Sequence, residues 1–497
     1  MKKIPISVLL GIFLVLGAST ALLLVLGVAT VEAKDKIVHD AEYYILEAQH
    51  GKKWAAEDKE IDKKLAEIRK KNGGKPPNLV YILLDDLGFG EIGMPNLDVI
   101  RGYSTPRISK LADEGLSLMR MYTEPSCTPT RAAMMTGRYA ARTGTSEAKA
   151  VVAGDGLAAW EVTLAEVLGK AGYATVHMGK WHLGDIEESY AINQGFDYAE
   201  HPMHQQGQMA LMNETAELEG LSIGQSSKLR ADTFELDKSF RTNPNAMVYG
   251  VVGKKGGPMR EVNFKAGEVY TQEHYNRMEE GYKQGALKQL ERLAKGDKPF
   301  FLQYWPQLPL TFTRSDIEQA KTLNGGPIAE SLAKVDGWIG EILDKIEELG
   351  IADNTIVLYS TDNGPHRNSW PDAGTSPFRN EKNTGWEGAY RIPSFARWPG
   401  KIKAGTVSND IISHLDWLPT LVAAAGEPQI KEKLMKGYDA DGKTYKVHLD
   451  GYNQMPFWKG EVDTDPRREI FYFDQAGNLN AIRYENWKAN AILWRPF

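Results

Sequence analysis

Cys127 is the only cysteine in this chain, and the residues around it suit chemistry on an anion. Residues 125–138 read PSCTPTRAAMMTGR, where Pro129 fits the first helical position, a threonine beside it can cap the helix, and Gly137 ends it. We therefore expect Cys127 at a helix N-terminus, where unpaired backbone N–H groups and Arg131 attract negative charge. A nucleophile at this position would attack an anionic group that is already held in place.

A second pair of ionisable residues follows a predicted strand at residues 173–178. The strand ends on Gly179-Lys180-Trp181-His182-Leu183-Gly184, which puts an ammonium group and an imidazole on one glycine-flanked loop. Taken separately, Lys180 reads equally well as a solvated surface charge, and His182 as a loop histidine with its hydrogen bonds satisfied.

Oxygen-bearing side chains follow two further predicted strands. Asp85 and Asp86 come directly after the apolar run 78–84, and Asp362 and Asn363 come directly after residues 354–360. Strand ends of this kind gather at one edge of an α/β sheet, where adjacent aspartates repel each other unless a cation is present. Paired aspartates are also common in solvated turns. If they do bind a metal, an all-oxygen set favours calcium or magnesium over zinc or copper.

Two of these stretches resemble the signatures of a known family. The pattern Cys-x-Pro-x-Arg with Thr-Gly-Arg after it resembles the first signature of type I sulfatases, the formylglycine-dependent members of the alkaline phosphatase superfamily, and residues 179–184 resemble the second. Residues 381–388 and 391–400 are similar to a later block of that family. The resemblance spans about residues 77–497, with the motifs in family order, and it implies an arylsulfatase-like hydrolase of sulfate monoesters. A lone cysteine is more often a small buried apolar residue, but the two signatures together argue against that interpretation here.

The resemblance implies a role for each matching position. Cys127 is oxidised to formylglycine by a formylglycine-generating enzyme. The implied catalytic residues are Cys127, Arg131, Lys180, His182 and Lys382. The implied ligands of one divalent cation, Ca²⁺ rather than Mg²⁺, are Asp85, Asp86, Asp362, Asn363 and Cys127.

In the implied mechanism, the aldehyde made from Cys127 is hydrated to a geminal diol, and one hydroxyl ionises beside the cation and Arg131 before it attacks sulfur. Lys180, Lys382 and the cation neutralise charge on the sulfuryl oxygens as the alcohol leaves. His182 then takes a proton from the second hydroxyl, so that the aldehyde re-forms and sulfate is expelled.

One position departs from the family pattern. After residues 299–306 the family usually has Pro-His-x-Pro, but this chain continues with Gln307 in place of the histidine. Gln307 can bind a sulfate ester through hydrogen bonds, but it cannot donate a proton as an imidazolium can. Protonation of the leaving group then falls to Lys382, falls to His366, or is missing, in which case acidic phenols are favoured. A surface loop histidine is the competing interpretation of His366.

Composition limits the class of protein. The 497 residues, 42% of them hydrophobic, can bury a large core, so the chain is neither disordered nor fibrous. The net charge of −6 and the lack of a basic block argue against a nucleic-acid partner. A single cysteine cannot form an intramolecular disulfide, so folding does not depend on oxidation.

The N-terminus predicts export. Lys2 and Lys3 precede residues 4–31, which contain no charged side chain. About 20 helical residues span a bilayer, so we expect an uncleaved membrane anchor with the catalytic part outside the cytoplasm, in the periplasm. Cleavage of a secretory signal after Ala33 is the alternative.

The predicted fold is α/β: a large, mostly parallel or mixed sheet flanked by helices, of the alkaline phosphatase and sulfatase type, with a small C-terminal antiparallel sheet and an N-terminal transmembrane helix. Residues 1–33 are the anchor or signal segment, 34–76 a charged helical stalk, 77–428 the catalytic domain and 429–497 the small sheet, whose pattern still runs at Phe497. We expect helices at 270–295, 328–349 and 411–425, and we interpret His414 and Asp416 in the last as structural.

Two other functions fit the same residues. The motifs also serve hydrolases of phosphate diesters or phosphonate monoesters, which activity on nitrophenyl phosphates would distinguish from a sulfatase. A non-catalytic anion-binding protein with an unconverted Cys127 is the second alternative, and the mass of the peptide that contains this residue distinguishes it.

Overall fold

The computed structural model describes residues 75–148, 154–202, 250–257, 260–261, 272–307, 327–366 and 376–491, together with isolated residues between 47 and 67. Residues 1–63 form one compact unit and residues 64–497 another. These isolated residues are helical, while most of the predicted stalk and the whole predicted anchor segment lie outside the described residues. Within the described part, no helix has the length and apolar character needed to cross a membrane.

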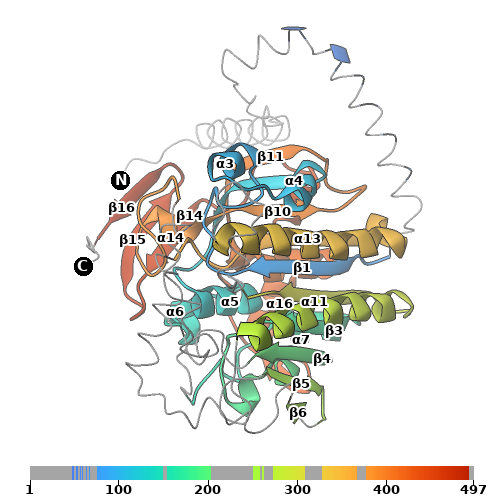
Figure 1. The fold of residues 1–497 in the computed structure, drawn as a ribbon. Coiled ribbons are helices and arrows are strands. Elements are labelled where there is room, and N and C mark those ends of the chain that lie inside the picture. Colours follow the sequence, from blue (N-terminus) through green and yellow to red (C-terminus); the bar gives the residue numbers. More distant parts are fainter. Residues whose placement is uncertain are drawn as a thin grey trace, which may run out of the picture. The chain divides into compact units, whose positions relative to one another are not determined.

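A large mixed sheet forms the centre of the fold (Figure 1). Its strands run in the order β11-β2-β10-β8-β1-β7-β3-β4-β5-β6, and β9 pairs with β2. Their bounds are β1 (Asn78–Leu84), β2 (Leu116–Tyr122), β3 (Ala174–Gly179), β4 (Tyr198–Pro202), β5 (Gly250–Lys254), β6 (Arg260–Glu261), β7 (Phe300–Trp305), β8 (Thr355–Thr361), β9 (Arg391–Ile392), β10 (Ser394–Arg397) and β11 (Thr406–Ser413). The predicted mixed α/β fold is therefore confirmed.

The central strands β8, β1, β7 and β3 are mutually parallel neighbours. Leu84 at the end of β1 pairs with Thr361 at the end of β8, and Gly179 at the end of β3 pairs with Trp305 at the end of β7. Their carboxyl ends therefore meet at one edge of the sheet, where open α/β sheets carry their binding sites.

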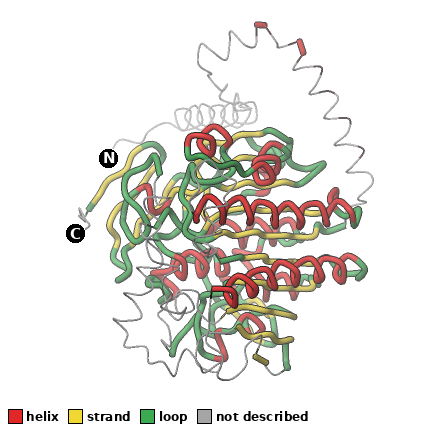
Figure 2. The backbone as a smooth tube through the Cα atoms, in the orientation of Figure 1, coloured by secondary structure: helices red, strands yellow, loops and turns green. Residues whose placement is uncertain are grey.

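Helices cover both faces of this sheet (Figure 2). They are α3 (Pro95–Ile100), α4 (Pro106–Asp113), α5 (Cys127–Thr136), α6 (Ala140–Thr143), α7 (Leu164–Lys170), α11 (Gln272–Ala294), α13 (Pro327–Glu348), α14 (Glu387–Tyr390), α15 (Trp417–Ala424), α16 (Ile430–Lys436) and α17 (Met455–Trp458). Short 3₁₀ helices are η1 (Glu187–Ser189), η2 (Ala191–Asn193), η4 (Ala352–Asn354) and η6 (His414–Asp416).

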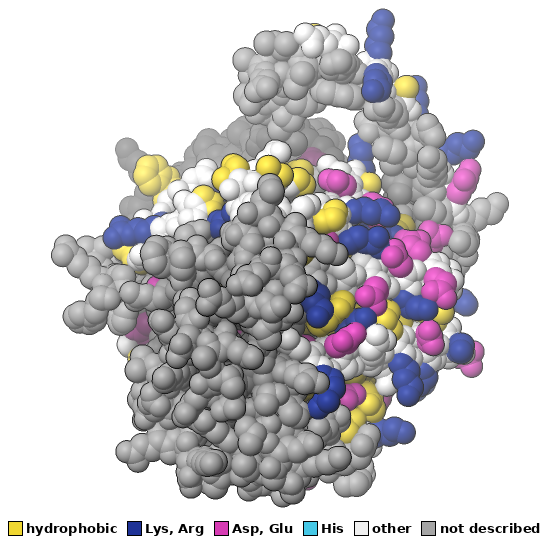
Figure 3. Space-filling view, viewed as in Figure 1, with side chains coloured by type: hydrophobic (Ala, Val, Ile, Leu, Met, Phe, Trp, Pro, Cys, Tyr) yellow, Lys and Arg dark blue, Asp and Glu magenta, His cyan; other side chains and the backbone are white. Residues whose placement is uncertain are grey.

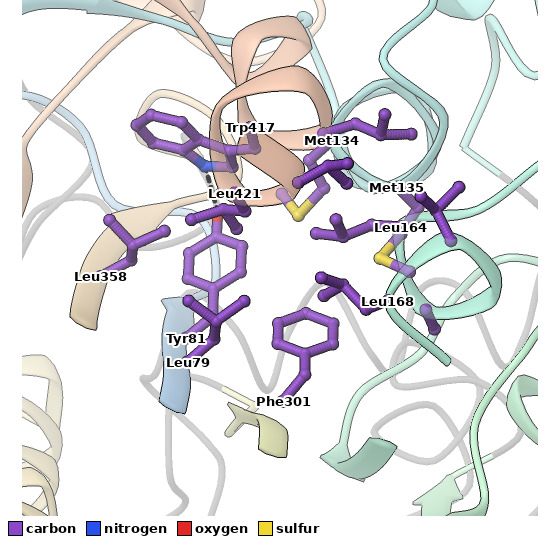
Figure 4. Close-up of a cluster of buried hydrophobic side chains, with 14 of the residues drawn as sticks. Leu79, Tyr81, Met134, Met135, Leu164, Leu168, Phe301, Leu358, Trp417 and Leu421 are labelled. Atoms are coloured by element: carbon purple, nitrogen blue, oxygen red, sulfur yellow. Dashed lines mark hydrogen bonds between the residues drawn. The ribbon is translucent and has the colours of Figure 1, made fainter. Parts of the chain in front are cut away.

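Alternate residues of β1 face two different cores. Val80, Ile82 and Leu84 pack with apolar residues of α4, α11 and α13. Leu79 and Tyr81 pack with α5, α7 and α15 on the other face, where the Trp417 indole N–H donates to the Tyr81 hydroxyl at 3.0 Å (Figure 4). Because both faces are buried, the strand reads as one continuous apolar run.

Three local predictions need correction. Residues 411–413 belong to β11 and not to a helix, because Ile411 and Ile412 pair with β2; the helix starts only at Trp417. Within the predicted C-terminal sheet, the pattern over residues 478–494 favours one strand, but the structure has two, β15 (Leu479–Tyr484) and β16 (Trp487–Asn490), since the chain turns at Glu485, where φ is 50°. The region after residue 430 contains α16 and α17 as well as strands.

The C-terminal part contains the predicted antiparallel sheet, formed by β14 (Glu469–Phe473), β15 and β16, and a separate two-stranded pair, β12 (Tyr438–Ala440) and β13 (Lys443–Tyr445). Arg467, just before β14, donates to the carboxylate of Asp416 in η6 at 2.6 Å, and both side chains are buried. His414 donates to or accepts from the Ser360 hydroxyl at 2.9 Å, and burial lowers its pKa to about 3. Both residues make structural contacts, as the sequence predicts.

The surface over α11 and α13 carries charges of both signs. In Figure 3, Lys and Arg side chains are intermingled with Asp and Glu on this face.

Candidate active site

The described site residues predicted from the sequence converge on the carboxyl edge of the central strands. Asp85 and Asp86 directly follow β1, Asp362 and Asn363 follow β8, and Lys180 follows β3. Cys127 comes from α5, whose first turn lies at the same edge. The strand order β8-β1-β7-β3 explains why residues up to 278 positions apart in the sequence meet here.

The cysteine begins α5, as expected, although the capping differs from the prediction. Ser126 is the N-cap, Cys127 is the first helical residue and Pro129 lies two positions further in. Gly137 ends the helix in the left-handed conformation, with φ of 65°. Arg131 lies one turn after Cys127, so both side chains project from the same face of the helix.

A compact acidic cluster is the core of the site. Four residues each contribute one ligand atom, and these atoms all lie within 4.8 Å of one another: Asp85, Asp86, Asp362 and Cys127. Asp85 Oδ2 and Asn363 Oδ1 are buried and have no hydrogen-bond partner within the described part of the chain. Buried carboxylate oxygens in such close contact, and buried oxygens left without donors, fit a hard divalent cation such as Ca²⁺ or Mg²⁺.

The backbone around the cluster is held in uncommon conformations. Asp86 has φ of 55°, in the left-handed region that a non-glycine residue rarely adopts, and its N–H donates to Asp362 Oδ1 at 3.0 Å. A Cβ on Gly364 would lie 1.7 Å from the carbonyl oxygen of Gly388, so only glycine allows these two loops to approach. Both features serve to bring the ligand loops together.

Arg131 is fully buried and joins the strands of the site. Its guanidinium donates to Asp362 Oδ2 at 2.9 and 3.2 Å and to Asp85 Oδ1 at 3.3 Å. A further N–H donates to the carbonyl oxygen of Lys180 at 2.5 Å, and the guanidinium lies 5.1 Å from the ring centroid of Trp305. One side chain therefore connects α5 with the ends of β1, β8, β3 and β7.

Two buried lysines complete the charge balance. Lys180 Nζ donates to Asp85 Oδ1 at 2.6 Å, and Lys382 Nζ donates to Cys127 Sγ at 2.8 Å and also to Asp86. Together with Arg131 they place three cationic groups against the three carboxylates. Added positive charge from a cation would release the lysines to bind an anionic substrate.

His182 lies next to the nucleophile position. It is buried, has φ of 58°, and its backbone carbonyl accepts a hydrogen bond from the Thr128 hydroxyl at 3.0 Å. This contact ties the 179–184 loop to the first turn of α5.

The pKa values reflect this crowding. Burial and the charge of Asp85 raise the pKa of Asp362 to about 7. Burial raises the pKa of the Cys127 thiol well above its usual range, and Asp362 and Asp86 add to the effect. The unmodified thiol is therefore neutral in this environment, which is the opposite of an activated nucleophilic cysteine.

Two residues outside this cluster were also predicted. Gln307 is buried two positions after β7, at the same edge of the sheet. His366 is half-buried. Burial opposes the lowered pKa of Asp86, whereas the charges of Lys382 and, to a smaller extent, His366 favour it.

Glu279 was missed by the sequence analysis. It lies on α11, is fully buried, and contacts both the backbone and the side chain of Gln307. The signal was its place among the buried helix positions Met278, Tyr282 and Ala286, where a glutamate breaks the apolar pattern.

Comparisons with known proteins agree with this geometry. The family profile described as Sulfatase matches residues 77–427. The chain is 31% identical over 442 residues to N-acetylgalactosamine-6-sulfatase of Homo sapiens, a match that covers 84% of this chain and 72% of the relative. It is 30% identical over 433 residues to Arylsulfatase A of Homo sapiens, covering 84% and 75%.

Solved structures show the same fold. The PsFucS1 sulfatase from Pseudoalteromonas sp. superimposes with a TM-score of 0.71 at 27% identity, covering 87% of this chain and 82% of that one. A second structure, Ps i-CgsB in complex with k-i-k-neocarrahexaose, has a TM-score of 0.62 at 23% identity, with 85% of each chain covered, which shows the likeness of the fold.

Glu124, three residues before Cys127, is a buried carboxyl group that makes no ion pair within the described residues. Burial raises its pKa to about 8, the charge of Asp450 adds to this rise, and the backbone N–H of Ala140 opposes it. An acid whose pKa is higher in the folded state than in the unfolded state lowers stability as pH rises between the two values.

We expect Glu124→Gln to remove this loss of stability. Relative to the wild type, the variant should gain about 3 kcal/mol in the free energy of unfolding between pH 5.5 and pH 8, because glutamine has no proton to release. Urea unfolding at the two pH values measures the gain. Glu188→Gln, at an exposed position, is the matched control, and an identical pH dependence for the wild type and Glu124→Gln would contradict the prediction.

Proposed function

Because this chain belongs to the sulfatase family and hydrolyses sulfate esters, we propose that it does so through a formylglycine made from Cys127, with arylsulfatase-like preference for its leaving group. The observation that carries the proposal is the position of Cys127: it begins α5 and lies within 4.8 Å of three carboxylates, while Lys382 donates to its sulfur. The neutral, buried thiol has no evident role in this setting, whereas a hydrated aldehyde at the same place supplies the nucleophilic hydroxyl.

We propose that Asp85, Asp86, Asp362 and Asn363, with residue 127, hold one divalent cation, Ca²⁺ in preference to Mg²⁺. The oxygen-only protein ligands and their two unsatisfied buried oxygens support this assignment. The cation would supply positive charge beside the nucleophile. Arg131 fixes the directions of Asp85 and Asp362 and so keeps the ligands in position.

The remaining groups have complementary roles. Lys180 and Lys382 are buried ammonium groups at the same edge, suited to bind the sulfuryl oxygens and to stabilise their charge as the ester bond breaks. His182 is suited to accept a proton from residue 127 in the step that releases sulfate. The phosphodiester and anion-binding alternatives lose support, because the relatives at 30% and 31% identity are sulfatases.

We expect the purified protein to cleave 4-nitrophenyl sulfate much faster than 4-nitrophenyl phosphate esters, and to lose this activity when a chelator removes the cation. Mass spectrometry of the peptide with residue 127 should show the aldehyde or its hydrate in the active fraction. Cys127→Ala is the inactive control. An active preparation that carries only the unmodified thiol, or full activity in excess chelator, would contradict the mechanism.

We propose His366 as the acid that protonates the leaving alcohol, since Gln307 cannot do so and His366 follows Asp362 and Asn363 at the end of β8. His366→Ala should lower kcat/KM for alkyl sulfates about a hundredfold and have little effect on sulfates of acidic phenols, whose leaving groups need no proton. Steady-state kinetics on the two ester classes measures the difference. Equal losses on both would rule out this role.

For location, we propose an anchor at residues 4–31 with the catalytic part in the periplasm, based on the uncharged segment that follows Lys2 and Lys3. A formylglycine-generating enzyme is then a required partner during maturation. Protease added to spheroplasts should digest the catalytic part while leaving cytoplasmic proteins intact. Full protection of the catalytic part would reverse the predicted orientation.

A further inference from the structure

Glu279 is a buried acid that the proposed mechanism does not use. It lies on α11, and its side chain is fully shielded from solvent. Within the described residues it forms no ion pair with a lysine or arginine. A buried carboxyl group without a cationic partner is costly to keep in a protein core, so its hydrogen bonds need a physical explanation.

Within the described residues, the hydrogen bonds to this side chain both come from one residue, Gln307. The backbone N–H of Gln307 donates to Glu279 Oε2 at 2.8 Å, and the side-chain Nε2 of Gln307 donates to Glu279 Oε1 at 2.5 Å. The two oxygens of one carboxyl group thus accept hydrogen bonds from the backbone and from the side-chain amide of the same glutamine. This double contact fixes the rotation of the Gln307 side chain, which a single hydrogen bond would not do.

The contact also determines which end of the amide faces which way. In the structure the amide nitrogen of Gln307 faces Glu279 and donates to its Oε1 atom. The carbonyl oxygen Oε1 then lies on the side of the amide turned away from α11. Gln307 is thereby oriented as a hydrogen-bond acceptor on that side.

Gln307 stands between groups of the active site. It follows β7, which lies between β1 with Asp85 and β3 with Lys180. Burial raises the pKa of Glu279 to about 8, the charge of Asp85 adds to the rise, and the donors of Gln307 and the charge of Lys180 oppose it. Glu279 is therefore close enough to Asp85 and Lys180 for their charges to affect its pKa.

We propose that Glu279 is a positioning residue that holds the Gln307 amide so that its carbonyl oxygen accepts a hydrogen bond from a hydroxyl group of the substrate alcohol, next to the sulfate ester. The inference rests on the proposed sulfatase function and adds a substrate class to it. That class is the sulfate monoester of an alcohol or phenol with a neighbouring free hydroxyl, as in polyols, saccharides and catechols. An imidazolium at position 307 would donate to the leaving oxygen, whereas a fixed amide carbonyl selects a donor on the leaving group.

The test compares two esters that differ by one hydroxyl, 4-nitrophenyl sulfate and 4-nitrocatechol sulfate. Glu279→Gln keeps the size of the side chain but places an NH₂ group against one N–H of Gln307, so the grip on the amide is lost. We expect kcat/KM for the catechol ester to fall about tenfold, the usual effect of losing one oriented hydrogen bond, with a change below about twofold for the phenyl ester.

A double-mutant cycle shows whether Glu279 acts through Gln307. In a Gln307→Ala background, Glu279→Gln should cause no further loss of selectivity between the two esters. Glu280→Gln, at the exposed neighbouring position on α11, is the matched control and should behave as wild type. If Glu279→Gln folds poorly, Glu279→Met replaces the charge with an apolar group of similar volume and should show the same change in selectivity.

Different failures have different meanings. Equal losses on both esters, or an undiminished effect of Glu279→Gln in the Gln307→Ala background, would overturn the positioning role while the sulfatase function stands. A wild-type enzyme that prefers the phenyl ester would overturn the substrate class. A wild-type enzyme that cleaves neither ester would overturn the proposed arylsulfatase-like activity, and the role of Glu279 with it.

Discussion

The guanidinium of Arg131, bound between Asp85 and Asp362, is the interaction on which the site depends. It is fully buried and is held by the two carboxylates and the Lys180 carbonyl that it contacts, with the Trp305 ring beside it. Because these partners follow β1, β8 and β3, the ion pairs also align the strand ends and the first turn of α5. Without the Arg131 guanidinium, Asp85 and Asp362 would repel each other in a medium of low dielectric constant, and the cluster of carboxylates would open.

The sequence predicted this arrangement well where the local signal was strong. Continuous apolar runs predict β1 and β8, because such runs depend on residues close in the chain. The prediction failed at residues 411–413, where pairing with β2 overrides a helical pattern. It also missed Glu279, because the contact with Gln307 joins a helix to a strand end, and the local pattern shows only a glutamate among apolar positions without naming its partner.

The replacement of a histidine by Gln307 changes the electrostatics of this edge of the sheet. An imidazolium would add positive charge beside Lys180, while a neutral amide requires no counter-charge but needs a fixed orientation to be useful. The buried Glu279 supplies that orientation from α11. Positions 307 and 279 are thus coupled, because the orientation of the Gln307 amide depends on Glu279.

The complete burial of Cys127 bears on how the enzyme matures. The side chain of Cys127 has no solvent-accessible surface in the folded chain, so another protein cannot reach it there. The proposed conversion to formylglycine would therefore have to act on the nascent chain, before the sheet closes around this residue. On that proposal, the fraction of active molecules in a preparation records the competition between folding and modification during synthesis.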